Sequence, residues 1–541
     1  MPGAVAAQPA PPPAPQAAVT SGAGEPAADA AAPSVAAAPS APSTPSVAAA
    51  PSATPGPTTA PSAAPAPSAA PAPSKRKPPP LHEELLPILL LVAVIALVVW
   101  RLPRVEIQHS SAFRRRRLLN WLPLGLTYAF LYMARYNIVA FKDVGGLSQQ
   151  EFGNIDAIGS LVYGVSFLIN GPLTDRWGGR VTILLAAGGA LTVNTIIGVL
   201  IATGNMGSSP VVSLGALYAL NMYFQSFGAV SIVKVNAGWF HLRERGVFGG
   251  IFGILISLGL YFAFDWGLRI GLALAPQWLF FIPAAILGLF WVLSFIWVRD
   301  HPSHAGFADF DAGDASSGDT GPRLDAATII KRMLSNKIIL IIAVIELCSG
   351  FLRQGILKWY RDFAKGVGIG DSFVYSHWGM VSCIAGITGG VFAGLISDHL
   401  FQSRRGPVSS VLYGVMVAGA LAILAFLGYA GMVSWIIAFM AMAIIGVHGM
   451  LSGVASQDFG GKRNAGTATG IIDGFVYLGT ALQAVVYGNF LPEKGSAAAK
   501  DPGNWIAWPG AMLPVAIIGM FFALKIWNAR AGKHVAPAAK A

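Results

Sequence analysis

Hydrophobic residues in this chain are gathered into long runs that short polar connectors separate. A helix rises about 1.5 Å per residue, so a run of roughly 20 apolar residues is long enough to cross a bilayer. Twelve such segments follow one another, at 118–141, 156–174, 181–203, 211–239, 247–271, 276–298, 337–360, 374–399, 407–430, 433–457, 465–488 and 505–528. The pattern predicts an all-α integral membrane protein with twelve transmembrane helices.

The connectors differ in charge according to the side on which they fall. One set is basic and contains Arg176, Arg180, Arg243, Arg245, Arg404, Arg405, Lys462, Arg463, Lys525, Arg530 and Lys533. The connectors 204–210 and 431–432 carry no charge. Basic connectors stay in the cytoplasm, which places the polar loop 299–336 and the C-terminus there. This loop divides the chain into six plus six segments, a first half at 115–300 and a second half at 337–530, joined by a central loop at 301–336.

The region before these segments has a different composition. Residues 1–80 are almost entirely Ala, Pro, Ser, Thr and Gly, which cannot form a packed core, so we expect a disordered tail. An apolar run at 85–102 follows, with basic residues on both flanks and the larger cluster, Arg114 to Arg117, after it. We interpret it as an extra transmembrane helix with the tail outside. The alternative is a helix lying along the membrane surface.

Composition narrows the class of protein. Only 11% of the residues are charged, far below the ~25% of soluble domains. The excess of 36 Lys and Arg over 25 Asp and Glu lies between the apolar runs, so it indicates membrane topology, not nucleic-acid binding. Both cysteines, Cys348 and Cys383, fall inside apolar segments, and no nucleophile, metal or cofactor motif is present in a workable context. We therefore expect neither an enzyme nor a metal or cofactor site.

An internal repeat relates the two halves. A Gly-x-x-x-Asp element ends at Asp175 after the second segment and at Asp398 after the eighth. One intramembrane arginine precedes each, Arg135 by 40 residues and Arg353 by 45. Parallel repeats in transporters of this kind place the substrate between the halves. The two arginines would then face each other across the central site.

Intramembrane arginines are costly in hydrocarbon and usually face a cavity or a partner. A guanidinium stays charged and presents a planar fork of donors that fits phosphate or carboxylate oxygens. Two of them, Arg135 and Arg353, predict an anionic substrate, and a doubly charged phosphate fits best. The alternative is that each arginine pairs with a structural acid or carbonyl, or reaches the interface from near a helix end.

Other polar residues within the segments are assigned by helical spacing. Tyr128 and Tyr132 share the face of Arg135 and offer phenol donors, with plain packing as the alternative. Lys234 either adds positive charge to the site or pairs with an acid. Asp265 and Arg269 are four apart and are expected to satisfy each other.

A second group of polar residues consists of candidates for coupling or gating. Glu346 lies two turns before Arg353 as a counter-charge or proton carrier, and Asp473 shares a face with Tyr477. His448 is either packed or a proton relay. Lys358 is a further charged residue inside a segment. The predicted gating contacts at the cytoplasmic mouth are Asp175, Arg176, Arg180, Asp398, Arg404 and Arg405.

The chain resembles the organophosphate:phosphate antiporter family of the major facilitator superfamily, which includes glycerol-3-phosphate and hexose-phosphate (sugar phosphate) transporters. The resemblance covers 115–528. The matching stretches are Tyr132 to Asn137, Ile282 to Ala284, Arg299 to Pro302, Glu244 to Gly246, Phe351 to Trp359, Ser397 to Gly406 and Ala465 to Gly479. It implies the major facilitator fold, phosphate binding by Arg135 and Arg353, and site tyrosines at Tyr128, Tyr132 and Tyr477.

The chain departs from the family pattern around the two arginines. Apolar residues or a thiol stand where glycerol-phosphate members carry a lysine, a histidine and an acid: Phe167, Leu255 and Cys383. The family's charge pair beside the arginines appears as Tyr136 and Lys358, and Lys234 replaces an arginine. The anion-binding residues are thus retained in a more apolar pocket, which makes glycerol-3-phosphate itself a poor candidate substrate.

These observations predict a secondary active transporter in the cell's inner (plasma) membrane. It would exchange a phosphorylated metabolite for inorganic phosphate by alternating access, as a monomer in the lipid bilayer. One alternative is a proton-coupled symporter of a carboxylate or other organic anion, with Glu346 or Asp473 carrying the proton. Another is a membrane sensor that binds a phosphorylated ligand.

Overall fold

The computed structural model describes residues 109–241, 245–310, 326–401 and 404–529, together with Leu89, Ala93 and Ala96. The chain divides into two units, Met1–Lys77 and Pro78–Ala541, and the first lies wholly outside the described residues. The predicted tail and all but three residues of the predicted extra helix 85–102 also lie outside them.

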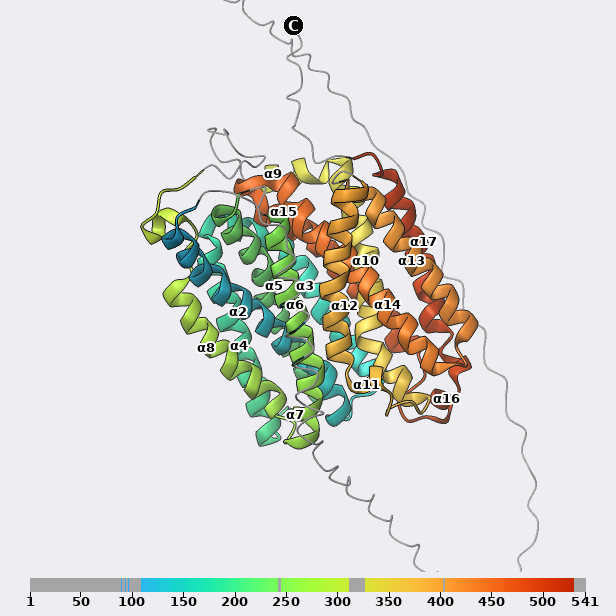
Figure 1. The fold of residues 1–541 in the computed structure, drawn as a ribbon. Helices are drawn as coiled ribbons and strands as arrows, with labels where there is room; N and C mark the ends of the chain where they lie inside the picture. Colours follow the sequence, from blue (N-terminus) through green and yellow to red (C-terminus); the bar gives the residue numbers. More distant parts are fainter. Residues whose placement is uncertain are drawn as a thin grey trace, which may run out of the picture. The chain divides into compact units, whose positions relative to one another are not determined.

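The first half of the second unit is a series of long helices (Figure 1). They are α2 (Ser111–Val144), α3 (Gln149–Trp177), α4 (Gly179–Thr203), α5 (Pro210–Trp239), α6 (Arg245–Tyr261), the π-helical turn η2 (Phe262–Trp266), α7 (Gly267–Ala273) and α8 (Trp278–Trp297). Local sequence sets several starts. Ser110 caps α2, Ser148 and Glu151 form a capping box on α3, and Pro210 occupies the first turn of α5, where its missing N–H costs nothing.

The second half follows a short 3₁₀ turn, η3 (Pro302–Ala305), and an amphipathic helix, α9 (Ala326–Leu334). Its helices are α10 (Lys337–Gly366), α11 (Phe373–Ser376), α12 (Trp378–Leu395), η4 (Ile396–Leu400), α13 (Arg405–Phe426), α14 (Ala430–His448), η5 (Gly449–Ala455), α15 (Ser456–Phe490), α16 (Ala497–Lys500), η6 (Pro502–Trp505) and α17 (Ala507–Lys525). Asn336 and Ser372 cap α10 and α11 through their side chains.

Each predicted apolar segment is helical over most or all of its length. Among the described residues, ten helices are long and apolar enough to cross a membrane. The two segments outside that set are α2, which begins with four arginines and carries Arg135 within it, and the shorter α12. The chain is thus an all-helical, multi-pass membrane protein.

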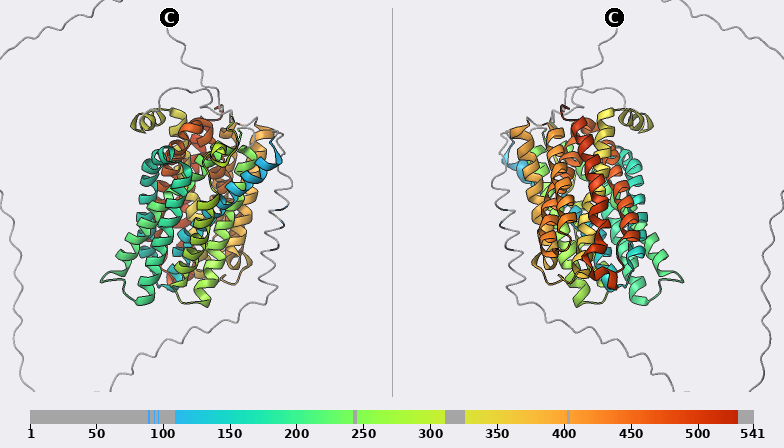
Figure 2. Two further views of the ribbon diagram at one scale, coloured as in Figure 1. Left: turned by 90° about the vertical axis from the view of Figure 1, so that its left-hand side faces the viewer. Right: turned by 90° about the vertical axis from the view of Figure 1, so that its right-hand side faces the viewer.

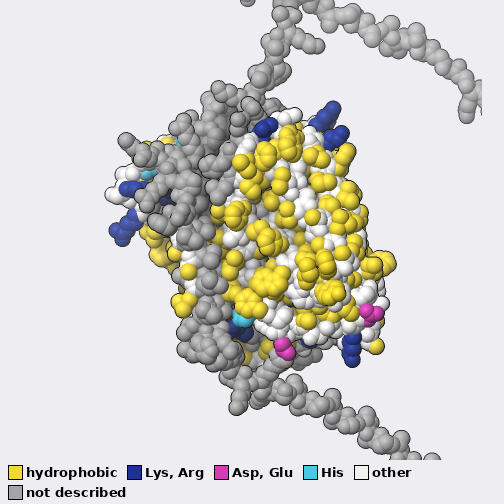
Figure 3. Space-filling model, turned by 45° about the vertical axis from the view of Figure 1, so that its right-hand side comes forward, with side chains coloured by type: hydrophobic (Ala, Val, Ile, Leu, Met, Phe, Trp, Pro, Cys, Tyr) yellow, Lys and Arg dark blue, Asp and Glu magenta, His cyan; other side chains and the backbone are white. Residues whose placement is uncertain are grey.

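The outward surface of the helices fits contact with lipid. Figure 3 shows one face covered by hydrophobic side chains, with charged ones gathered towards its two ends. Large apolar residues are exposed along many helices, among them Leu161, Val292, Leu421, Phe439 and Phe521. Exposed apolar area on this scale is foreign to soluble monomers and is what a bilayer would cover.

The helices form two groups, α2–α8 and α10–α17, whose members pack mainly against one another (Figures 1 and 2). The groups meet along two long seams, α3 against α15 and α6 against α12. We call the end that carries residues 299–310 and α9 the loop side, and the end that carries α7, α11 and α16 the opposite side (Figure 1). The polar residues of interest lie between the seams.

Candidate functional site

Arg135 of α2 is buried among the helices, and side chains of three other helices accept hydrogen bonds from its guanidinium. Its guanidinium is 1% exposed and donates from Nε to Gln225 Oε1 at 2.9 Å, from Nη1 to the Tyr477 hydroxyl at 2.6 Å and from Nη2 to the Tyr163 hydroxyl at 2.7 Å. These partners come from α5, α15 and α3, so one side chain joins both halves. All three acceptors are neutral, which leaves the positive charge without a counter-ion among these contacts.

Aromatic rings complete the surroundings of Arg135. The Arg135 guanidinium carbon lies 4.5 Å from the ring centre of Tyr163 and 4.8 Å from that of Tyr132. Tyr128 packs edge-on against Tyr132, and Tyr132 stacks on Tyr136. Ring faces attract a cation without neutralising it. The predicted Tyr128, Tyr132 and Tyr477 therefore all lie at or next to Arg135, which is oriented and still positively charged.

Arg353 is equally buried, at 2% exposed, but its neighbours leave more of its guanidinium donors without a hydrogen bond. Its Nε and Nη2 find no hydrogen-bond partner within the part of the chain that the structure describes. A buried donor left unpaired costs about 1–3 kcal/mol, and more when it is charged. A buried guanidinium with two unpaired donors is what an anion-binding site would contain.

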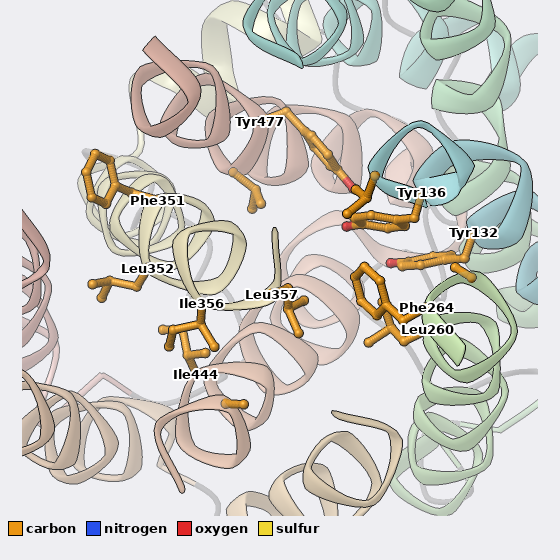
Figure 4. Close-up of a cluster of buried hydrophobic side chains, with 14 of the residues drawn as sticks. Tyr132, Tyr136, Leu260, Phe264, Phe351, Leu352, Ile356, Leu357, Ile444 and Tyr477 are labelled. Carbon is orange, nitrogen blue, oxygen red and sulfur yellow. The ribbon is translucent and has the colours of Figure 1, made fainter. Parts of the chain in front are cut away.

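Aromatic and apolar side chains lie between the two arginine-bearing helices, α2 and α10. Figure 4 shows Tyr132 and Tyr136 of α2 and Tyr477 of α15 projecting towards Leu357 of α10. Gln354 of α10 donates to the Tyr136 hydroxyl at 2.7 Å and so ties α10 to α2. A ligand between the arginines would meet hydroxyl groups and apolar surface, with few charges other than the guanidinium groups.

Lys234 pairs with an acid of the same half. Its Nζ is 2.8 Å from Asp175 Oδ1, which is the structural pairing that the sequence left open. Asp175 also accepts from the backbone amides of Gly466 and Thr467 and from the Thr467 hydroxyl, at 3.2, 2.8 and 2.8 Å. Asp175 and Lys234 belong to the first half and the other two residues to the second, so this contact joins the halves towards the loop side.

Among the other predicted gating residues, Arg180, Arg404 and Arg405 form hydrogen bonds with residues of their own half. Arg180 donates its amide to Asp300 Oδ1 at 2.9 Å and its Nη2 to the Phe295 carbonyl at 2.9 Å, while Arg176 is exposed. Arg404 donates to the Phe401 carbonyl at 3.1 Å and Arg405 to Ser397 Oγ at 2.9 Å. Asp398 lies in η4, and its side chain is outside the described residues.

Three of the predicted coupling residues, Glu346, His448 and Asp473, have partners inside the second half. Glu346 is fully buried and lies 2.9 Å from Nδ1 of His448, and one of its oxygens has no partner in the described part of the chain. Asp473 accepts a hydrogen bond from Ser452 in η5. Glu346 precedes Arg353 by seven residues on α10 and therefore lies on the same face of that helix.

Lys358 and Asp265 have partners that helical spacing does not predict. Lys358 Nζ lies 2.5 Å from Asp156 of α3, and the two residues are 202 positions apart. Asp265 pairs with Arg361 of α10 at 3.0 Å and accepts from the amides of Gly379 and Met380. These contacts join the two halves.

Tyr163 and Gln225 contact Arg135 directly and are absent from the predicted site. Neither is charged, so a search for intramembrane charges passes over them. One usable signal exists, because amide side chains are rare in membrane helices and usually have an interhelical partner. Gln225, Asn221 and Asn194 are such residues, and their hydrogen bonds link α4 and α5 to the neighbourhood of Arg135.

Comparison with known proteins identifies the family. Residues 121–484, more than half of the chain, match the Major Facilitator Superfamily. The chain belongs to this superfamily. It is a transporter-type membrane protein and not an enzyme, and the described residues contain no group of three or more metal-binding side chains.

Relatives within the Major Facilitator Superfamily include proteins of organophosphate transport. The chain is 27% identical over 460 residues to the glycerol-3-phosphate transporter of Bacillus subtilis, covering 79% of this chain and 96% of that protein. It is 26% identical over 405 residues to the membrane sensor protein UhpC of Escherichia coli, covering 70% and 86%. The phosphoglycerate transporter protein of Salmonella typhimurium is 23% identical over 425 residues, covering 73% and 87%.

Among solved structures of this superfamily, the D-xylose-proton symporter superposes with a TM-score of 0.51 at 16% identity. The superposition covers 75% of this chain and 97% of that one. At this identity the likeness shows the fold alone.

Proposed function

We propose that this protein exchanges a phosphorylated metabolite for inorganic phosphate by alternating access. Two six-helix halves, twelve transmembrane helices in all, would rock about the site between Arg135 and Arg353. The observation that carries the proposal is the pair of unsatisfied Arg353 donors opposite an Arg135 that neutral groups hold in place. An organophosphate or phosphate dianion supplies the missing charge and the missing acceptors.

Obligate exchange follows from the same charges. With no anion bound, the site holds two guanidinium charges in a low-dielectric interior, and reorientation would carry both through it uncompensated. A bound dianion neutralises them and lowers that barrier. The next anion to bind, whether phosphate or a phosphate ester, then permits the halves to return. The relatives that transport glycerol-3-phosphate and phosphoglycerate support this choice of substrate class.

The surroundings of the arginines favour a substrate with an apolar body. Phe167 is buried and packs edge-on against Tyr163, 4.6 Å between ring centres. Leu255 and Cys383 are buried as well, and Cys383 lies in an apolar cluster with Ile254 and Tyr261. No charged group in these positions would bind the hydroxyls of a small polyol phosphate. We therefore infer a phosphorylated metabolite other than glycerol-3-phosphate.

The experiment that tests this function is exchange of labelled phosphate into phosphate-loaded proteoliposomes. Arg135→Lys and Arg353→Lys each keep a positive charge and lose the bidentate fork. We expect both to reduce exchange at least about 100-fold, the equivalent of roughly 2.7 kcal/mol. Arg115→Lys, at an exposed arginine in the second turn of α2, is the matched control and should exchange normally. Absence of exchange by correctly folded wild type would refute the proposal.

One observation favours a second function. The buried Glu346–His448 pair beside Arg353 resembles a proton-binding site, as a proton-coupled organic-anion symporter requires. Such a symporter would accumulate substrate under a pH gradient with no phosphate on the far side, whereas an exchanger would not. A membrane sensor, the third possibility considered above, would bind phosphate esters without moving them.

In the proposed membrane arrangement, the loop side and the C-terminus face the cytoplasm of a cell whose plasma membrane holds the protein. This follows from the basic connectors on that side. The extra N-terminal helix and the tail outside are part of the same proposal. We expect the transporter to act as a monomer, because the substrate site lies within one chain.

A further inference from the structure

Helix α10 carries a series of cations that begins at the central site and continues to the opposite side. After Arg353 come Lys358, Arg361 and Lys365, at spacings of five, three and four residues. Spacings of three and four place the last three on one face of the helix. Over these 12 residues the helix rises roughly 18 Å, enough to connect the centre of the membrane with its surface. We call Lys358, Arg361 and Lys365 the α10 cation series.

Each member of the α10 cation series is paired with an acid of the first half. Lys358 lies 2.5 Å from Asp156 of α3, and Arg361 lies 3.0 Å from Asp265 of η2. Lys365 lies 3.9 Å from Asp143 at the end of α2, and Lys494 of the second half also pairs with Asp143. Three helical elements of one half therefore supply acids to one helix of the other. A reversed pair, Lys142 with Asp362, lies among them.

Burial gives these pairs a role in holding the opposite side closed. The Lys358 and Asp156 side chains are 3% and 0% exposed, whereas Lys365 is 52% exposed at the outer end. Separating a buried pair without replacing it leaves two unpaired charges in low dielectric, so the inner pairs hold the halves together most strongly. A cavity of roughly 10 Å³, about the size of one water molecule, lies beside them and is lined by Lys142, Asp143, Lys358, Arg361 and Asp362 among apolar residues.

Opening this side would separate the two signs of charge. The acids Asp143, Asp156 and Asp265 stay with the first half, while the three cations stay on α10 with Arg353 at the inner end. The α10 face then carries three cations against the single acid Asp362. A surface of one sign that leads into a low-dielectric site concentrates and guides ligands of the opposite sign.

We propose that the α10 cation series is an access path for phosphate-bearing anions from the opposite side, covered by first-half acids when that side is closed and exposed when it opens. The inference rests on the proposed function, because it requires an anionic substrate and an opening of the halves. An arriving phosphate contacts Lys365, then Arg361 and Lys358, before it reaches Arg353. Once it has passed, the acids pair with the cations again and close the path behind it.

A charge exchange between Asp156 and Lys358 separates this role from a purely structural one. The double variant Asp156→Lys/Lys358→Asp keeps an ion pair across the seam and hence the closing contact. It moves the cation from α10 to α3 and puts an acid on the path. KM for labelled phosphate is measured at each face, with right-side-out and inside-out membrane vesicles. We expect KM at the opposite side to rise roughly tenfold and KM at the loop side to stay within about twofold.

Lys365→Glu provides a second variant that does not disturb the core, because Lys365 is half exposed. It should raise KM at the opposite side severalfold at low ionic strength and much less at high salt, since exposed charges are screened. Lys337→Glu, an exposed lysine at the other end of the same helix, is the matched control and should leave that KM unchanged.

The outcomes distinguish the access path from the exchange function. If wild type exchanges phosphate and the folded double variant and Lys365→Glu both keep the wild-type KM at the opposite side, the access path is refuted and the exchange function stands. If the double variant does not fold, Lys365→Glu decides alone by the same criterion. Wild type that exchanges no phosphate would overturn both proposals.

Discussion

At the scale of single residues, the two central arginines differ in how far the protein itself satisfies their donors. Arg135 makes three hydrogen bonds to side chains from three helices, so it contributes to the stability of the fold. Arg353 has two buried donors without partners among the described residues, as the proposed anion site requires. The same substitution at the two positions should therefore have different consequences.

We predict that Arg135→Lys lowers stability and Arg353→Lys lowers binding. Lysine cannot reach all three acceptors of Arg135, and loss of one or two hydrogen bonds from a charged group should cost about 2–4 kcal/mol of unfolding free energy. Arg353→Lys removes donors that have no partner, so stability should stay within about 1 kcal/mol. Thermal unfolding with and without phosphate checks this. Equal destabilisation by both variants would contradict the assignment.

Tyr163→Phe should reduce transport because Arg135 loses a partner that positions it. The change removes the acceptor for Arg135 Nη2 and the 3.4 Å hydrogen bond from the Tyr163 hydroxyl to the Gln225 carbonyl, and it keeps the ring that packs over the guanidinium. We expect about 1–2 kcal/mol of lost stability and a several-fold rise in KM for phosphate exchange. The matched control is Tyr429→Phe, at an exposed tyrosine beyond the end of α13. A variant indistinguishable from wild type in KM would mean that Tyr163 does not position Arg135.

The residues of the site were predictable only where charge or helical spacing marks them. Arg135 and Arg353 stand out as guanidinium groups inside apolar runs, and Tyr132 follows from its spacing to Arg135. Tyr163 and Gln225 are neutral residues on other helices, and nothing local relates them to an arginine 28 or 90 residues away. Lys234 is a charged residue whose partner the sequence does not reveal. A lone cation within an apolar segment is easily found, but its sequence does not say whether an acid such as Asp175 faces it.

At the scale of helices, the seam between α3 and α15 depends on glycines that face one another. A methyl group built on Gly153 would lie 2.7 Å from Cα of Gly488, and one on Gly164 would lie 2.9 Å from the carbonyl oxygen of Gly474. Small residues of this kind let two membrane helices approach until their backbones touch. The seam is therefore intolerant of any side chain along much of its length.

Gly164→Ala should push α3 away from α15. Because the obstructing atom is a backbone oxygen, no side-chain rotation relieves the clash, and we expect about 1–3 kcal/mol of destabilisation together with slower exchange. Gly414→Ala in α13, where an added methyl group meets open space, is the control and should be neutral. Thermal unfolding and the rate of phosphate exchange measure the effect. Normal stability in Gly164→Ala would show that the seam is looser than described.

Helix positions were predictable from the sequence and helix partners were not. Runs of apolar residues identify α4 or α13 because a lipid environment requires both length and hydropathy. The pairing of α3 with α15 joins parts of the chain about 300 residues apart, and Asp156 with Lys358 about 200 apart. No periodicity within one helix encodes such contacts. The repeat of Arg135 and Arg353 is the one long-range relation that the sequence does display.

At the scale of the whole molecule, the proposed transport cycle requires a fixed orientation in the membrane. Two exposed serines can be replaced by cysteine to test this orientation. Ser208→Cys is in the uncharged connector after α4, and Ser335→Cys is between α9 and α10. The native Cys348 and Cys383 are buried and give little background. A membrane-impermeant thiol reagent added to intact cells should label position 208 and leave position 335 unlabelled. The reverse pattern would place the loop side outside the cell.

In the proposed function the two halves form an obligate exchanger of phosphate esters for phosphate. Proteoliposomes loaded with labelled phosphate test this when its efflux is followed as phosphorylated metabolites, or none, are added outside. We predict negligible efflux without an external phosphate or phosphate ester, prompt efflux with a transported ester, and no dependence on an imposed pH gradient. Efflux into anion-free buffer, or movement of an organic anion driven by a pH gradient alone, would contradict it.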